Sequence, residues 1–169
     1  MKFAIDCGHN CPPDTGAVGI QEECKLTRAV GNYVIQKLRE SKHEVIDVTP
    51  TRALSVTSSL RQRVGKANSE KVDIYVSIHF NAFNQKAHGT EIFATSKKGR
   101  EIATPVLQEI CKLGFFNRGV KNGSHLLVVR ETVAPAILIE CCFIDSKRDM
   151  DIFNIEKMGE AIVAGLLKN

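Results

Sequence analysis

Two apolar segments of the chain end on a histidine, and a third ends on a glutamate. The segments FAIDCGH, DIYVSIH and AILIE end at His9, His79 and Glu140. In sheets built from parallel strands, ligands bind at the edge where the carboxyl ends of the strands meet, so we expect these three side chains to converge. Imidazole nitrogen and carboxylate oxygen are the ligands of catalytic zinc sites, which use three protein ligands and leave a fourth position open.

The third metal ligand is expected to be a carboxylate on the helix that follows the first histidine. Glu22 and Glu23 both qualify by position. Glu23 fits better because it lies three residues before Leu26 and seven before Val30, which places it on the inward stripe of that helix. The sequence therefore predicts that Glu23 completes a metal site with the two histidines.

Glu140 is the candidate for proton transfer in such a site. A hydrolase needs a second carboxylate that accepts a proton from water and passes it to the leaving amine. Glu140 follows four apolar residues, where a carboxylate is costly unless a charged group lies beside it. Simpler explanations exist: a histidine at a strand end often caps or packs, and a glutamate at a helix start stabilises the helix dipole.

The pattern of apolar residues predicts the elements that position these side chains. Strands are expected at 2–7, 43–49, 73–79, 90–95, 126–131 and 136–142, and helices at 24–41, 57–69, 98–113 and 156–167. The strand segments are apolar throughout and alternate with helices, which is typical of a sheet covered on both faces. We predict a single α/β domain over residues 1–169, with a mixed, mainly parallel sheet of about six strands.

The composition favours a globular domain and disfavours several classes of partner. The 169 residues are 43% hydrophobic and carry a net charge of +4, with Lys and Arg dispersed along the chain. This charge favours anionic partners such as cell-wall polymers but forms no basic stripe, and two Tyr without Trp offer no stacking platform for nucleic acid. No run approaches the ~20 apolar residues of a membrane helix, and no leader pattern precedes the first strand. We expect no nucleic-acid partner, no membrane span and no export signal.

The cysteines are expected to be free thiols. None forms a CxxC pair, and a chain of this size without an export signal is typical of a reducing compartment. The adjacent pair near the C-terminal third points to opposite faces of a strand and is poorly placed for a disulfide. The six residues are Cys7, Cys11, Cys24, Cys111, Cys141 and Cys142.

Several longer motifs match one enzyme family over essentially the whole chain. GHN followed by DTGAVG is similar to the family pattern GHGG-x-D-x-GA-x-G, and ECKLTRAV is similar to the segment that begins with a metal-binding glutamate. VTPTR, LRQRVGKANSEKVDIYVSIHFNA, GTEIF and PAILIECCFIDS match further blocks. The chain resembles the zinc-dependent N-acetylmuramoyl-L-alanine amidases of the amidase-3 type.

The resemblance implies one zinc ion held by His9, Glu23 and His79, with Glu140 as the catalytic acid/base. It implies hydrolysis of the amide between the lactyl group of N-acetylmuramic acid and L-alanine of the peptidoglycan stem peptide. Peptidoglycan is then the expected partner, and we expect a monomer. The enzyme would act on the cell wall, either as a phage endolysin released from the cytoplasm or as a secreted or periplasmic bacterial enzyme.

The sequence departs from the family pattern near both ends of the site. Asn10 and Cys11 stand where the family usually has glycines after the first histidine. Cys7 and Cys11 flank that histidine and are candidates for additional soft metal ligands, although packing is the simpler explanation. Cys142 shares the strand face of the catalytic glutamate, so it either lines the pocket or packs in the core.

Three polar residues near the motifs have open roles. Asn81 either contacts the substrate, supports a metal ligand or forms a turn. Arg52 and Arg63 are candidates for binding anionic wall groups, and surface charge is the simpler explanation for Arg63.

Other classes of function remain open at this stage. A metallo-peptidase could use the same ligand set, and a non-catalytic wall-binding relative could keep the fold without turnover. A cysteine hydrolase would use Cys7 or Cys142 with a histidine.

Overall fold

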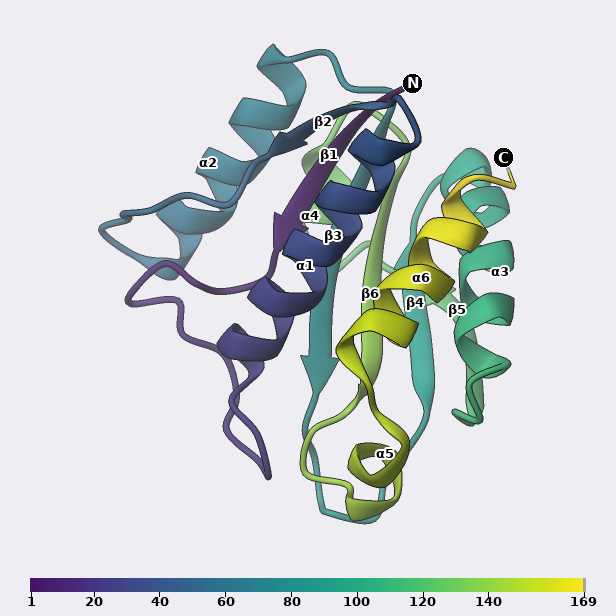
Figure 1. Cartoon of the computed structure of the whole chain (residues 1–169). Helices are drawn as coiled ribbons and strands as arrows, with labels where there is room; N and C mark the ends of the chain where they lie inside the picture. Colours follow the sequence, from purple (N-terminus) through teal and green to yellow (C-terminus); the bar gives the residue numbers. More distant parts are fainter. Residues whose placement is uncertain (169) are drawn as a thin grey trace.

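The apolar runs of the sequence form the inner strands of a six-stranded sheet. The computed structural model describes residues 1–168 (Figure 1). The strands lie in the order β2-β1-β3-β6-β4-β5, and all neighbours pair in parallel except β4 with β6. Their bounds are β1 (Lys2–Cys7), β2 (Glu44–Asp47), β3 (Ile74–Asn81), β4 (Thr90–Ala94), β5 (Asn117–Asn122) and β6 (Ala136–Phe143). The predicted mixed, mainly parallel sheet is confirmed.

Helices cover both faces of this sheet, as predicted. Their bounds are α1 (Glu23–Glu40), α2 (Val56–Ser69), α3 (Lys97–Cys111), α4 (Leu127–Glu131), α5 (Lys147–Ile152) and α6 (Ile155–Leu166). The larger core lies between the sheet and the layer formed by α1, α3 and α6, which Figure 1 shows in front of the strands. A smaller core lies on the opposite face under α2 and α4. The fold is a three-layer α/β domain.

The long helices follow directly from the sequence. In α1, Leu26, Val30, Val34 and Leu38 recur every four residues and all are buried against the sheet. This spacing keeps one stripe of the helix turned to the core. Where α2 begins, the Ser55 hydroxyl accepts a hydrogen bond from the Ser58 N–H at 3.1 Å and caps the helix.

One predicted strand is wrong. Where a strand was predicted at 126–131, residues Leu127–Glu131 form the short helix α4, which buries Val128 and Val129. A short apolar run fits a buried strand and a buried helix turn equally well, so periodicity could not distinguish them. The sixth strand is instead β5, with the sequence NRGVKN, which pairs with β4 at the edge of the sheet. An edge strand needs few apolar residues, and polar side chains protect its free edge.

The predicted site residues lie slightly differently from the expected strand ends. His79 is two residues before the end of β3 and Glu140 three before the end of β6, while His9 is two residues beyond β1. His79 and Glu140 are register partners on adjacent strands. Register partners point to the same face, so both side chains lie on the face covered by α2 and α4.

Among residues 1–168, no helix has the length and apolar character needed to cross a bilayer.

Candidate metal centre and active site

The structure brings together His9, Glu23 and His79 from three separate segments. One ligand atom of each residue lies within 4.8 Å of the others, a spacing that allows all three to hold one metal ion. Glu23 Oε1 lies 3.0 Å from His9 Nε2 and 3.1 Å from His79 Nδ1. Two imidazole nitrogens and a carboxylate oxygen are a donor set that zinc accepts in catalytic sites.

The first residue of α1 is the carboxylate that turns inward. Glu23 is 4% exposed, and backbone N–H groups of Phe80 and Ala17 donate to its two oxygens at 3.1 and 2.9 Å. Glu22 instead pairs with Lys25 at 2.6 Å on the surface. The choice of Glu23 over Glu22, which rested only on the helical stripe, therefore agrees with the burial of the two side chains.

A buried carboxylate orients the first histidine. His9 Nδ1 donates to Asp14 Oδ1 at 2.6 Å, which leaves Nε2 facing Glu23. Such a carboxylate fixes the tautomer and the ring plane of a metal-binding histidine. Sequence reasoning gave Asp14 no role, although a carboxylate five residues after a predicted metal-binding histidine was a usable signal.

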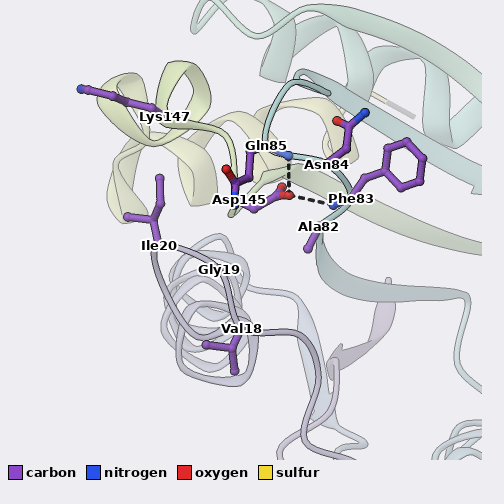
Figure 2. Close-up of a pocket in the computed structure, with 9 residues that line it drawn as sticks. All are labelled: Val18, Gly19, Ile20, Ala82, Phe83, Asn84, Gln85, Asp145 and Lys147. Atoms are coloured by element: carbon purple, nitrogen blue, oxygen red, sulfur yellow. Dashed lines mark hydrogen bonds between the residues drawn. The ribbon is translucent and has the colours of Figure 1, made fainter.

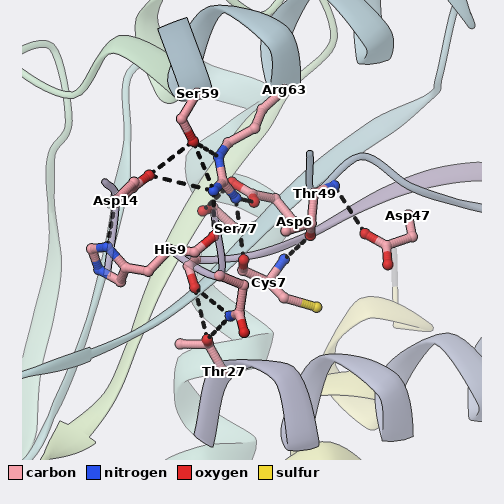
Figure 3. Close-up of polar contacts among 12 residues, drawn as sticks. Asp6, Cys7, His9, Asp14, Thr27, Asp47, Thr49, Ser59, Arg63 and Ser77 are labelled. Carbon is pink, nitrogen blue, oxygen red and sulfur yellow. Dashed lines mark hydrogen bonds and ion pairs between the residues drawn. The ribbon is translucent and has the colours of Figure 1, made fainter. Parts of the chain in front are cut away.

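Arg63 anchors this loop from α2, and its assignment as surface charge was wrong. The side chain is 1% exposed and forms an ion pair with Asp6, while Asp14 Oδ2 lies 3.4 Å from its guanidinium (Figure 3). It also donates to the backbone carbonyls of Cys7, at 3.1 Å, and of His9. An Arg placed four residues after buried Ser59 lies on the inward stripe of α2, which a surface residue would not occupy.

Two glycines allow the close approach of the ligand side chains. A Cβ on Gly8 would lie 2.5 Å from atoms of the His79 ring. A Cβ on Gly16, which has a φ of +76°, would lie 2.7 Å from the His9 ring and 2.9 Å from Glu23 Oε2. Any side chain at either position would displace a ligand.

The candidate ligands carry opposite charges, negative on Glu23 and positive on His9. Burial works to raise the pKa of Glu23, but hydrogen bonds with His79 and His9 outweigh it and hold that pKa far below its ordinary value. Burial also disfavours the charged form of His9, but hydrogen bonds to Asp14 and Glu23 raise its pKa to about 9. The site therefore favours positive charge beside Glu23, which a divalent cation would supply.

Glu140 lies next to this group on β6, beside His79. Burial raises the pKa of Glu140 to about 7, with further upward contributions from Glu23 and Glu91 and opposing ones from the histidines. Its Oε2 is buried and has no hydrogen-bond partner among residues 1–168. A carboxylate that titrates near neutral pH and keeps a free oxygen is suited to accept and return a proton.

Comparison with known proteins identifies the family. A family model described as Amidase_3, N-acetylmuramoyl-L-alanine amidase, matches residues 3–168. The chain belongs to this family. An uncharacterised 38.4 kDa protein of Clostridium perfringens is 35% identical to it over all of this chain and 52% of the relative. An endolysin of Bacillus phage SPP1 is 34% identical over 85% of this chain and 55% of the endolysin.

A solved structure supports the same assignment. The catalytic domain of CD27L endolysin, which targets Clostridia Difficile, aligns with a TM-score of 0.91 and 27% identity. The alignment covers 100% of this chain and 98% of that domain. The chain spans about half the length of the curated relatives it matches, 52% and 47% for the first two.

The cysteines of this amidase-family chain do not belong to the candidate metal group found among residues 1–168. All six are free, and the group of side chains able to hold a metal within residues 1–168 contains no cysteine. Burial raises the pKa of Cys7 to about 12 and that of Cys142 well above its ordinary value. Both stay protonated at neutral pH, so neither is suited to be a nucleophile. Both pack in the core, Cys7 with its sulfur against Gly31 of α1.

A pocket lies between residues 18–20 and the loop that follows β3. It has a volume of about 810 Å³, and Figure 2 shows Val18 and Ile20 on one side of it and the loop 82–85 on the other. Asp145 holds that loop, since its Oδ2 accepts hydrogen bonds from the N–H groups of Phe83 and Gln85 at 3.0 and 2.9 Å. Neither the candidate metal ligands nor Glu140 line this pocket, whose lining begins at Val18, one residue after Ala17, the residue that donates to Glu23.

The structure shows the surroundings of two further polar residues that the sequence singled out, Asn81 and Arg52. Asn81 Nδ2 donates to Glu91 Oε1 at 3.0 Å, so Asn81 supports a neighbouring carboxylate. Arg52 is exposed on the loop before α2. Sequence reasoning also missed Glu91, whose signal was a charged residue inside the apolar run TEIFA.

Proposed function

We propose that this chain is a zinc-dependent N-acetylmuramoyl-L-alanine amidase. It would hydrolyse the amide that joins the lactyl group of N-acetylmuramic acid to L-alanine of the peptidoglycan stem peptide. The single observation that carries the proposal is the convergence of His9, Glu23 and His79 within 4.8 Å, with Glu140 in register beside His79. Family membership supports the choice of substrate.

Different residues of the chain would bind the metal, orient a ligand and transfer the proton. His9, Glu23 and His79 would hold the metal, and Asp14 would keep His9 in the tautomer whose Nε2 faces it. Bound zinc supplies a Lewis acid that polarises the substrate carbonyl and lowers the pKa of water toward neutrality. Glu140 Oε2 accepts the proton of the attacking water and returns it to the alanine nitrogen as the amide bond breaks.

The relatives support a proposal for where the enzyme acts. Those with matching sequences include a phage endolysin and the N-acetylmuramoyl-L-alanine amidase CwlM of Bacillus licheniformis. We propose that this chain acts on the cell wall as a monomeric catalytic unit, in phage lysis or in bacterial wall remodelling. The 810 Å³ pocket between residues 18–20 and 82–85 would provide room for part of a substrate polymer.

Digestion of purified peptidoglycan tests the proposal. The zinc-loaded protein should release stem peptides with a free N-terminal alanine and leave intact lactyl carboxylates on the glycan, as measured by mass spectrometry. Chelator and Glu140→Gln should each abolish the release. Cleavage between amino acids of the stem would instead establish a metallo-peptidase, and absence of any product from the zinc-loaded protein would refute catalysis.

A further inference from the structure

A buried glutamate next to the candidate active site forms ion pairs with two cationic side chains. Glu91 on β4 is 4% exposed, and its Oε2 accepts hydrogen bonds from Arg118 Nε at 2.9 Å and from Lys121 Nζ. Its Oε1 accepts a bond from Asn81 at 3.0 Å. Burial alone would raise the pKa of Glu91, but the bonds from Lys121 and Arg118 outweigh it and hold the pKa below its ordinary value. Glu91 is therefore ionised at neutral pH.

The strand register places this cluster beside Glu140. Glu140 is the register partner of His79 on one side and of Glu91 on the other. The three side chains therefore form a row across β3, β6 and β4, with register partners about 5 Å apart at their Cβ atoms. Arg118 and Lys121 come from the next strand, β5. Lys121 is the register partner of Phe93, two residues beyond Glu91, and its side chain reaches Glu91. The cations lie on the same sheet face as the candidate acid/base.

The cluster carries one more positive charge than negative charge. Most of the Arg118 guanidinium is already in contact with other groups. Besides Glu91, it donates to the His88 carbonyl at 3.4 Å and stacks 4.9 Å from the centre of the Phe143 ring. Lys121 differs: its side chain is 40% exposed, and Glu91 is the one hydrogen-bond partner of its ammonium within the described chain. An ammonium has three donors, so Lys121 has donors left for a ligand.

We propose that Lys121, oriented by Glu91, binds a free carboxylate of the stem peptide. The inference rests on the proposed amidase activity and names the part of the substrate that the enzyme selects. Adjacent strands are about 4.8 Å apart, so the cluster lies roughly 10 Å or less from Glu140, and an extended peptide covers about 3.5 Å per residue. That distance spans at most three residues, and we assign Lys121 to the free α-carboxylate of the second residue on the leaving side of the scissile amide. Lys121 thus determines specificity, while Glu91 is a positioning residue.

A matched pair of substrates tests the assignment. We would use N-acetylmuramoyl tetrapeptides that differ only at the second residue, which carries either a free α-carboxylate or the carboxamide. Wild type should prefer the carboxylate substrate, and Lys121→Gln should raise the KM for that substrate about three- to tenfold while changing kcat and the KM for the amide less than twofold. Lys121→Arg should retain the preference, because it keeps the charge.

The control removes a comparable ion pair elsewhere. Lys112, at the end of α3, bonds Glu109 at 2.6 Å, so Lys112→Gln loses one cation and one glutamate contact away from the site and should leave both KM values unchanged. Equal KM changes for both substrates in Lys121→Gln, or no change in either, would overturn the carboxylate assignment. If wild type cleaves neither substrate, the proposed amidase function fails as well. Cleavage without discrimination overturns only the role of Lys121.

Discussion

At the scale of single residues, the metal centre depends on the missing side chain of Gly8. An added Cβ would lie 2.5 Å from the His79 ring, closer than real Cβ contacts allow. Gly8→Ala should therefore displace His79 and weaken zinc binding at least tenfold, an effect comparable to the loss of an outer-shell partner. Competition titration with a chromophoric chelator measures this affinity.

Gly65→Ala is the matched control for that substitution. Gly65 lies inside α2, and no atom lies within 4 Å of an added Cβ. Zinc affinity should be unchanged, and helix propensity should stabilise the variant by roughly 0.5–1 kcal/mol. Equal zinc affinity in Gly8→Ala and wild type would show that the His79 ring can shift without loss of binding.

Ionisation of Glu140 lowers the free energy of unfolding of the metal-free protein as the pH rises. Its pKa is raised from 4.5 to about 7, so ionisation is disfavoured in the folded state. The penalty is absent below pH 4.5, grows between pH 4.5 and 7, and is complete above pH 7. Glu140→Gln should therefore increase the free energy of unfolding at pH 8 by roughly 2–3 kcal/mol relative to its effect at pH 4.5.

Urea unfolding of the metal-free proteins at pH 4.5 and pH 8 measures this difference. Comparing the two pH values cancels any constant cost of burying the amide. A difference between variant and wild type that does not change with pH would contradict the raised pKa of Glu140.

The sequence singled out the candidate ligands more readily than the groups that contact them. His9, His79 and Glu140 stood out because each follows an apolar run, and Glu23 because of its helical stripe. Asp14, five residues after His9, and Glu91, inside an apolar run, each carried a signal that was not used. Their further contacts could not be predicted because they join segments that become neighbours only in the fold. Asp14 contacts Ser59, 45 residues away, and Glu91 contacts Lys121, 30 residues away.

At the scale of elements, α2 supports the site through one buried arginine. Arg63 joins Asp6 of β1 to Asp14 and to the His9 carbonyl (Figure 3). Arg63→Met would leave two buried carboxylates without their cation, which typically costs about 3–5 kcal/mol of unfolding free energy. Thermal or urea unfolding would measure the loss.

The neighbouring Arg61 provides the comparison. It is exposed on the same helix, so Arg61→Met should change the unfolding free energy by less than about 0.5 kcal/mol. Similar stabilities of the two variants would mean that the ion pairs of Arg63 contribute little.

The elements that the sequence misassigned share a physical cause. Apolar periodicity reports burial, so it identified β1, β3, β6 and the long helices. It failed for α4, whose buried turn is too short to show a helical period, and for β5, whose polar sequence reflects its place at the sheet edge. The short polar helix α5 was missed for the same reason.

At the scale of the whole molecule, the candidate functional side chains follow one another across neighbouring strands of the sheet. The candidate metal ligands come from the loop after β1, the start of α1, and β3. The candidate acid/base lies on β6, and the cation pair lies on β5, bonded to Glu91 of β4. The predicted α/β class and the layering of helices follow from the alternation of apolar runs. The order of strands does not, since it depends on pairings between remote segments.

Zinc stoichiometry and turnover, measured together on purified protein, test the central claim most directly. Wild type and Glu140→Gln should each bind one zinc ion per chain by elemental mass spectrometry, while His79→Ala should lose it. Only wild type should release stem peptides from peptidoglycan. Full zinc occupancy in His79→Ala, or turnover near the wild-type rate in Glu140→Gln, would contradict the account.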